Sequence, residues 1–318
     1  MNSKDKRSTL ILTALAVIFI GAFLLIGVNS NNFQYAIYKR VPKILAMVLT
    51  GSAIGVSSLI FQTVTNNRIL TPSILGIDSL YTLLQTSVVF LIGSTSVLIT
   101  NANINFLITI AAMLLFSSLL YKFLFKKNSK NIFNLLLIGV VCGTLFESLT
   151  TFMQVLIDPV EFQVVQDKMQ ASFNNINVDL LLIASVVIII CLGYVYDYLK
   201  ILDVMSLGRD AAINLGVDYD VVVKKMLIVV VLLTSVATAL VGPITFLGLL
   251  VVNIARQLIT SHKHGVLGIA TILISIVSLI GGQLLVEQLM NFGVSVAIII
   301  NFVGGIYFIY LVMKERGQ

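Results

Sequence analysis

The chain has 318 residues, of which 58% are hydrophobic and only 11% charged, and its mean hydropathy is +1.05. Soluble domains carry charge on about a quarter of their residues, so these charges are too few to cover a soluble protein of this length. The high hydrophobicity also excludes a disordered chain. The composition therefore predicts a polytopic membrane protein.

Apolar runs recur along the whole chain. A helix that crosses a bilayer needs about 20 apolar residues. Ten runs meet or approach this length, and they lie near residues 9–28, 44–66, 73–93, 104–125, 132–157, 180–197, 222–241, 247–261, 266–288 and 295–313. The first follows three basic residues and is long enough to span, so we interpret it as a retained helix and not as a signal peptide. The sequence predicts an all-α fold of about ten transmembrane helices, with residues 1–318 forming one transmembrane domain.

The positive charges indicate the orientation of these spans in the lipid bilayer. With the N-terminus in the cytoplasm, the cytoplasmic gaps contain sixteen of the twenty Lys and Arg residues. Membrane proteins keep such an excess on the cytoplasmic side, so we expect both termini there. The net charge of +6 mostly reflects this topology. No nucleic-acid partner is expected, because the basic residues are not gathered with aromatic residues on a polar surface.

Prolines and polar segments mark the edges of the spans. All four prolines lie at predicted span edges, where the missing N–H would be unpaired in any case; they are Pro42, Pro72, Pro159 and Pro243. The two longest polar segments are the outer loop 158–179 and the inner loop 198–220. Each is long enough to hold a short helix.

The chain lacks the motifs of bond-making chemistry. It contains neither the glycine-lysine loop that binds nucleotide phosphates nor a zinc motif. The two histidines, His262 and His264, have no carboxylate nearby in the sequence. We interpret them as part of a solvated basic loop, with a metal site as the alternative. No catalytic residue, metal site or cofactor is expected.

Glu147 is the one carboxylate that the sequence places deep in a predicted span. An acid inside the membrane usually faces the bundle interior or a water-filled path. Gly139, Gly143 and Thr151 share its helix face at four-residue spacing. This small, polar face fits either close helix packing or the lining of a translocation pathway. The second span carries a similar stripe that ends in Gln62, toward the cytoplasm.

Two polar clusters indicate possible protein contacts. Lys39, Arg40 and Lys43 lie outside and break the positive-inside pattern. They are either anchors at the membrane surface or a docking site for an acidic partner. Residues 207–217 of the inner loop end near Gly216, which suits the end of a helix. This segment is either an interfacial helix or a helix that docks a cytoplasmic partner.

The segment after the seventh span resembles a family signature. Residues 242–249, Gly-Pro-Ile-Thr-Phe-Leu-Gly-Leu, are similar to the G-P-I-x-F-x-G-L signature of the iron-siderophore and cobalamin permeases, which are the membrane subunits of binding-protein-dependent ABC importers. Arg256 matches the arginine of the family's V-P-H-x-x-R, although Asn253 replaces the histidine. The motif positions carried over are Gly242, Pro243, Phe246, Gly248 and Arg256.

Other segments extend the resemblance over nearly the whole chain. Residues 62–76 are similar to the family's Q-x-x-x-x-N-P-L-A-x-P-x-x-L-G, and residues 40–43 to its R-x-P-R before the second span. Gly304 and Gly305 match its G-G-P, with isoleucine for the proline. Residues 66–72 and 281–283 resemble the branch of the family that handles ferric catecholate-type siderophores.

The resemblance implies the type II ABC importer permease fold in a bacterial cell membrane, and import of a ferric siderophore. It implies cytoplasmic ATPase subunits, an extracytoplasmic siderophore-binding protein or lipoprotein, and a second permease chain, identical or sibling, around a path on the two-fold axis. It assigns docking of the binding protein to Arg40 and Lys43. It assigns ATPase coupling to the loop that contains Arg209, Leu215 and Gly216.

The residues expected along the translocation pathway are Glu147, Thr151 and Gln62. The alternative function is a secondary transporter or channel that uses Glu147 as a coupling site for a proton or ion. Neutralising Glu147 would separate the two. A coupling carboxylate is required for gradient-driven transport, whereas a lining residue changes only the rate or the substrate preference.

Overall fold

The computed structural model describes residues 2–28, 33–125, 132–174 and 176–315, and the described residues form helices and no strand. In chain order the elements are α1 (Ser3–Leu25), α2 (Phe33–Val64), the 3₁₀ turn η1 (Pro72–Leu75), α3 (Ile77–Ile92), α4 (Val97–Thr100), α5 (Ala102–Phe125), α6 (Ile132–Leu156), α7 (Pro159–Met169), α8 (Val178–Met205), α9 (Arg209–Asn214), α10 (Tyr219–Val241), α11 (Leu247–Leu258), α12 (His264–Gln288) and α13 (Val296–Glu315).

Each of the ten predicted spans contains a helix within the described residues. Eight of these helices are long and apolar enough to cross a membrane by length and composition, whereas α3 and α11 are shorter. Their 16 and 12 residues rise only about 24 and 18 Å, less than the roughly 30 Å of a bilayer core. Each is preceded by a short segment outside the α-helices, η1 or residues 242–246, which lengthens its path through the bundle.

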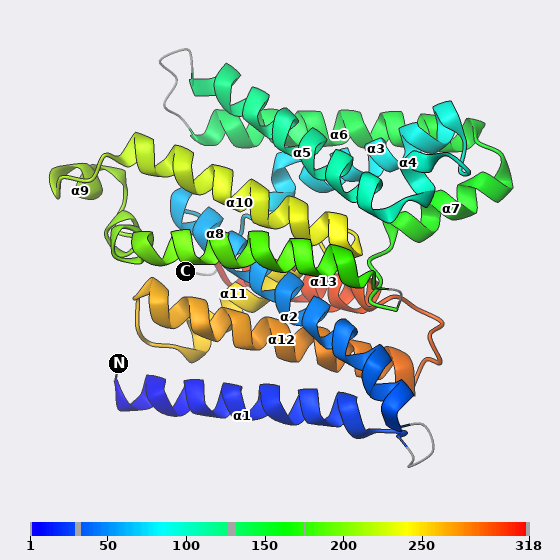
Figure 1. Ribbon diagram of the computed structural model, residues 1–318. Helices are drawn as coiled ribbons and strands as arrows, with labels where there is room; N and C mark the ends of the chain where they lie inside the picture. Colours follow the sequence, from blue (N-terminus) through cyan, green and yellow to red (C-terminus); the bar gives the residue numbers. More distant parts are fainter. Residues whose placement is uncertain (1, 29–32, 126–131, 175, 316–318) are drawn as a thin grey trace.

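The helices run roughly side by side, and α2 crosses the middle of the bundle (Figure 1). Most of α2 is buried because α8, α10, α11 and α12 all pack against it. Gly51 and Gly55 permit the close approach of α12, since a Cβ at either would lie within about 3.0 Å of Ser275 or Thr271. The small-residue stripe of the second span is therefore a packing surface.

The two ends of the bundle carry different short elements. The first turn of α1 and the last turn of α13 lie at the same end as α9, and α4 and α7 lie at the opposite end (Figure 1). The predicted short helices in loops 158–179 and 198–220 are confirmed as α7 and α9. We call the α9 end the inner end and the α7 end the outer end.

One proline prediction is wrong. Pro42 lies inside α2, which begins nine residues before it at Phe33. Proline has no N–H to bond the carbonyl of Tyr38, four residues earlier. Tyr38 is exposed near the outer start of the helix, where water can take the freed carbonyl. Pro159 follows the expected pattern as the first residue of α7, after the N-cap Asp158.

Candidate functional site

The two residues expected to dock a binding protein are held by contacts inside the chain. Arg40 Nη1 donates to the carbonyl oxygens of Phe23, Leu24 and Ile26 at 2.9, 3.1 and 2.8 Å. These are unpaired carbonyls at the C-terminus of α1, where a cation is favourable. Lys43 is 15% exposed, and its Nζ lies 3.2 Å from the Glu287 carboxylate. The docking role remains a prediction, and both side chains also fasten the outer end.

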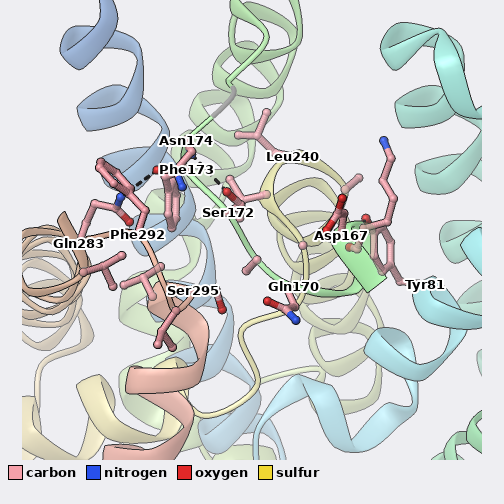
Figure 2. A pocket seen from close by; sticks show the side chains of 18 of the residues that line it. Tyr81, Asp167, Gln170, Ser172, Phe173, Asn174, Leu240, Gln283, Phe292 and Ser295 are labelled. Carbon is pink, nitrogen blue, oxygen red and sulfur yellow. Dashed lines mark hydrogen bonds between the residues drawn. The ribbon is translucent and has the colours of Figure 1, made fainter. Parts of the chain in front are cut away.

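Beside this pair is an outer cavity of about 530 Å³, between the α7–α8 linker, the end of α10 and the α12–α13 turn (Figure 2). Gln283 donates to Asn174 at 3.1 Å and to Glu287 at 3.0 Å, which joins the cavity wall to the Lys43 pair. Phe292 lines the cavity with a left-handed backbone (φ 61°), which is uncommon for a residue other than glycine. The sequence patterns gave no indication of this cavity.

The cavity also explains the first glycine of the motif. Gly242 has φ of +98°, and a Cβ there would lie 2.9 Å from Ala171 Cα. The α7–α8 linker crosses the end of α10 at this point, and Ser172 N donates to Val241 O at 2.8 Å. At the same cavity, burial lowers the pKa of the Lys168 ammonium.

The rest of the motif fixes α11 against its neighbours. A Cβ at Gly248 would collide with the side chain of Ser58, so only glycine fits where α11 meets α2. Phe246 packs on α13, where Gly304 leaves room for its ring, and its N–H donates to the Asn301 side chain at 3.3 Å. Asn253, in place of the family histidine, donates to Arg68 O at 3.1 Å.

Glu147 and Thr151 lie on an open face of α6. Ser79 Oγ donates to Glu147 Oε1 at 3.1 Å, and Thr151 Oγ1 donates to the Glu147 carbonyl at 2.9 Å. Both residues are exposed in the single chain. Gly139 and Gly143 instead pack against the turn from η1 into α3, because a Cβ at Gly139 would lie 2.9 Å from Leu75 Cα. This stripe therefore combines helix packing with an exposed carboxylate.

Gln62 does not meet Glu147. It is 2% exposed and lines a separate inner cavity of about 670 Å³. Neither its amide nitrogen nor its amide oxygen has a hydrogen-bond partner. The three residues expected along one pathway therefore occupy two places, an inner cavity and the outward face of α6.

A second membrane-embedded carboxylate escaped the sequence analysis. Asp78 lies in the first turn of α3, and Thr238 Oγ1 donates to its carboxylate at 3.4 Å. The predicted span 73–93 placed Asp78 near its cytoplasmic end. Instead, residues 72–75 form η1, and Asp78 packs beside hydroxyl groups of α2 and α10. The sequence feature that could have identified Asp78 is an acidic residue in the first turn of a helix, where the helix dipole favours a negative charge.

The solvated-loop interpretation is right for His262 and wrong for His264. His262 is exposed, whereas His264 is 2% exposed at the start of α12. Its Nδ1 lies 2.7 Å from Asp203 Oδ1 and its Nε2 lies 2.8 Å from Thr63 Oγ1. The carboxylate comes from α8, 61 residues earlier, which local spacing cannot reveal. The described residues contain no cluster of three metal-ligating side chains.

The predicted coupling residues project at the inner end. Arg209 begins α9. Its Nη2 lies 3.5 Å from Asp220 Oδ1, and its guanidinium packs over the ring of Tyr219. Leu215 follows α9 and is 64% exposed. Gly216 turns the chain with φ of +84°. Leu215 is thus exposed at this end of the bundle, and its role in coupling stays a prediction.

The long apolar helices of the described residues are those of a polytopic membrane protein. The FecCD transport family matches residues 8–314, and the chain belongs to this family. It is 56% identical over 313 residues to the petrobactin import system permease protein YclO of Bacillus subtilis (strain 168), covering 98% of this chain and 99% of that protein. It is 33% identical to the petrobactin import system permease protein FatC of Bacillus anthracis, covering 92% and 82%.

The fold also matches a solved structure, described as an inward-facing conformation of a putative metal-chelate type ABC transporter. The TM-score is 0.84 at 23% identity, with 98% of this chain and 99% of that chain covered. The match confirms the predicted type II importer permease fold.

Proposed function

We propose that this chain is the permease subunit of a binding-protein-dependent ABC importer that carries a ferric siderophore into the cytoplasm. The observation that carries the proposal is the 56% identity, over nearly the full length of both chains, to a petrobactin import permease. Petrobactin is a catecholate-type siderophore, in agreement with the branch that the sequence resembles. The chain itself performs no bond chemistry, and a partner chain hydrolyses ATP.

The inner end is the proposed contact with the ATPase. Leu207 and Ile213 are exposed on either side of Arg209, as is Leu215. Together these apolar side chains form a small projecting knob around α9. Nucleotide binding that moves the ATPase would push on this knob, and the bundle would alternate between two packings. With α9 inside, both termini are cytoplasmic, which agrees with the distribution of positive charge.

The outer end is the proposed contact with the siderophore-binding protein. Lys39 is exposed beside Arg40, while the Arg40 and Lys43 head groups bond within the chain. A second permease chain would cover the open face of α6. There Thr151 and Val155, four and eight residues after Glu147, are exposed together with it. In the dimer, Glu147 would face the path between the two chains.

Reconstitution tests the proposal. The chain, its ATPase and its binding protein in liposomes should accumulate ferric petrobactin only when ATP is supplied. Uptake driven by a proton gradient without ATP would instead support the secondary transporter.

The Glu147→Gln variant separates the same alternatives within one protein. As a lining residue, Glu147 should alter the uptake rate and leave the dependence on ATP intact. Thr144→Ala, on the same exposed face of α6, is the matched control. Complete loss of uptake in Glu147→Gln, with ATP hydrolysis still stimulated by the loaded binding protein, would contradict a simple lining role.

A further inference from the structure

An apolar groove of about 290 Å³ lies over α2, between α8 and α12. α12 packs mainly against α2, α8 packs against both α10 and α2, and α8 and α12 contact each other little. Two glycines of α12 keep the groove open: a Cβ at Gly268 would meet only Leu59 Cδ2 at 4.0 Å, and one at Gly265 only Leu199 Cδ1 at 3.6 Å. Its rim includes the exposed side chains of Tyr196 and Ile269, so it opens on the lateral, lipid-facing surface.

The groove leads to the inner cavity along the same helices. On α8 the groove wall ends at Leu202, and the cavity wall begins at Asp203. On α2 the groove wall ends at Ile60 and the cavity wall begins at Gln62. His264 lines both spaces. The two spaces are neighbours that share the His264 wall; the one nearer the middle of the helices is apolar and the one at the inner end is polar.

The inner cavity is strongly basic. Arg68, Arg256 and Lys263 line it, together with His262. The guanidinium groups of Arg68 and Arg256 are close enough to repel each other. The carboxylate among the described lining residues, Asp203, is already engaged by His264 at 2.7 Å. This arrangement favours an anion between the cations.

Two buried donors in the cavity lack partners. Gln62 is 2% exposed and neither atom of its amide is hydrogen-bonded, and the Arg256 Nε is buried and also unpaired. A buried polar group without a partner is destabilising, so these atoms point to a ligand with hydrogen-bond acceptors. Both lie at the wall of the basic cavity.

We propose that the groove and the inner cavity form one binding site for an anionic phospholipid of the leaflet at the inner end. An acyl chain occupies the groove between α8 and α12. The phosphate accepts hydrogen bonds from Arg68, Arg256 and the Gln62 amide. Basic pockets between transmembrane helices bind lipid head groups in this way. The site is independent of what the chain transports.

Binding to the delipidated full chain in detergent tests this site. The melting midpoint and native mass spectra are recorded with phosphatidylglycerol, with phosphatidylcholine of the same acyl chains, and with inorganic phosphate. Phosphatidylglycerol should raise the midpoint and remain as an adduct, and the other two should not. Equal retention of both lipids would overturn the proposal, and so would an equal rise with inorganic phosphate, which would indicate a soluble oxyanion.

Two kinds of variant test the two halves of the site. Arg68→Gln with Lys263→Gln should weaken phosphatidylglycerol binding roughly 25-fold, at about fivefold for each cation removed. Lys4→Gln with Lys6→Gln is the matched control, because both lysines are exposed at the same end on α1.

Gly268→Leu should fill the groove and weaken the lipid at least about tenfold, because several methylene groups lose their burial. Gly193→Leu on α8 is its control, since a Cβ there meets nothing within 4 Å and Gly193 does not line the groove. The midpoints of the lipid-free variants verify folding. Unchanged lipid affinity in both folded test variants would refute the site.

Discussion

The Lys43–Glu287 pair offers a sharp test of how the outer end is held together. The ammonium and carboxylate are 3.2 Å apart and their side chains are only 15% and 8% exposed, so neither charge is well hydrated. Lys43→Met removes the cation and leaves Glu287 with its bond from Gln283 at 3.0 Å. Removing one partner of a buried pair costs about 3–5 kcal/mol. The partial exposure places the expected loss near the lower value, about 3 kcal/mol.

A double-mutant cycle separates the pair from other effects of the substitution. Replacing both charges by neutral groups of similar shape is often nearly neutral, so Lys43→Met with Glu287→Gln should recover most of the lost stability. The measurement is the free energy of unfolding of the purified chain, or its melting midpoint, which should fall by several degrees in Lys43→Met. Lys39→Met, on the same helix and exposed, is the control.

The same proteins separate stability from docking. Affinity for the siderophore-binding protein is measured for the single and double variants at low and high salt, because surface charge pairs weaken as salt rises. If the double variant regains both stability and affinity, Lys43 acts by fastening α2 to α12. If it regains stability alone, Lys43 also contacts the partner. A Lys43→Met variant as stable as the original chain would refute the reasoning.

Two further changes test the motif and the inner knob. Gly248→Ala should abolish folded protein in the membrane, because its Cβ would lie 2.7 Å from the Ser58 Cβ. The control Gly305→Ala should be tolerated, because nothing lies within 4 Å of a Cβ there. The measurement is the yield of monodisperse protein extracted in detergent, and a normal yield of Gly248→Ala would contradict the packing. Leu215→Asp should leave the chain folded, because Leu215 is 64% exposed, and should prevent co-purification of the ATPase. An intact complex would show that α9 is not the main contact.

Local patterns predicted the helices well, because a membrane-spanning helix must satisfy its backbone within one continuous segment. The ten apolar runs became ten helices. The boundaries shifted where the helices extend beyond the apolar run: α2 starts at Phe33, before Pro42, and α8 continues to Met205. An apolar run marks the part of a helix that lies inside the bilayer, and it does not show where the helix ends outside it.

The motif glycines can be recognised in the sequence, but only the structure explains why glycine is needed there. The residues of the run 242–249, with those of the other matching segments, resemble the family signature, and the FecCD transport family matches residues 8–314. Why glycine is needed at Gly242 and Gly248 depends on Ala171 and Ser58, which lie far away in the sequence. Glycine is required at such places because two backbones or side chains meet there, and a single chain segment cannot reveal which ones.

The sequence by itself determined the membrane class, the ten apolar runs that form helices and the charge bias between alternate gaps, because each depends on composition or on short-range order, and its motif residues carried the family resemblance. Only the tertiary structure decided which polar groups meet. It paired Lys43 with Glu287, buried His264 against Asp203, and separated Gln62 from Glu147. In a chain with so few charges, the partner of each polar side chain is set by helix packing, and packing joins residues tens or hundreds of positions apart.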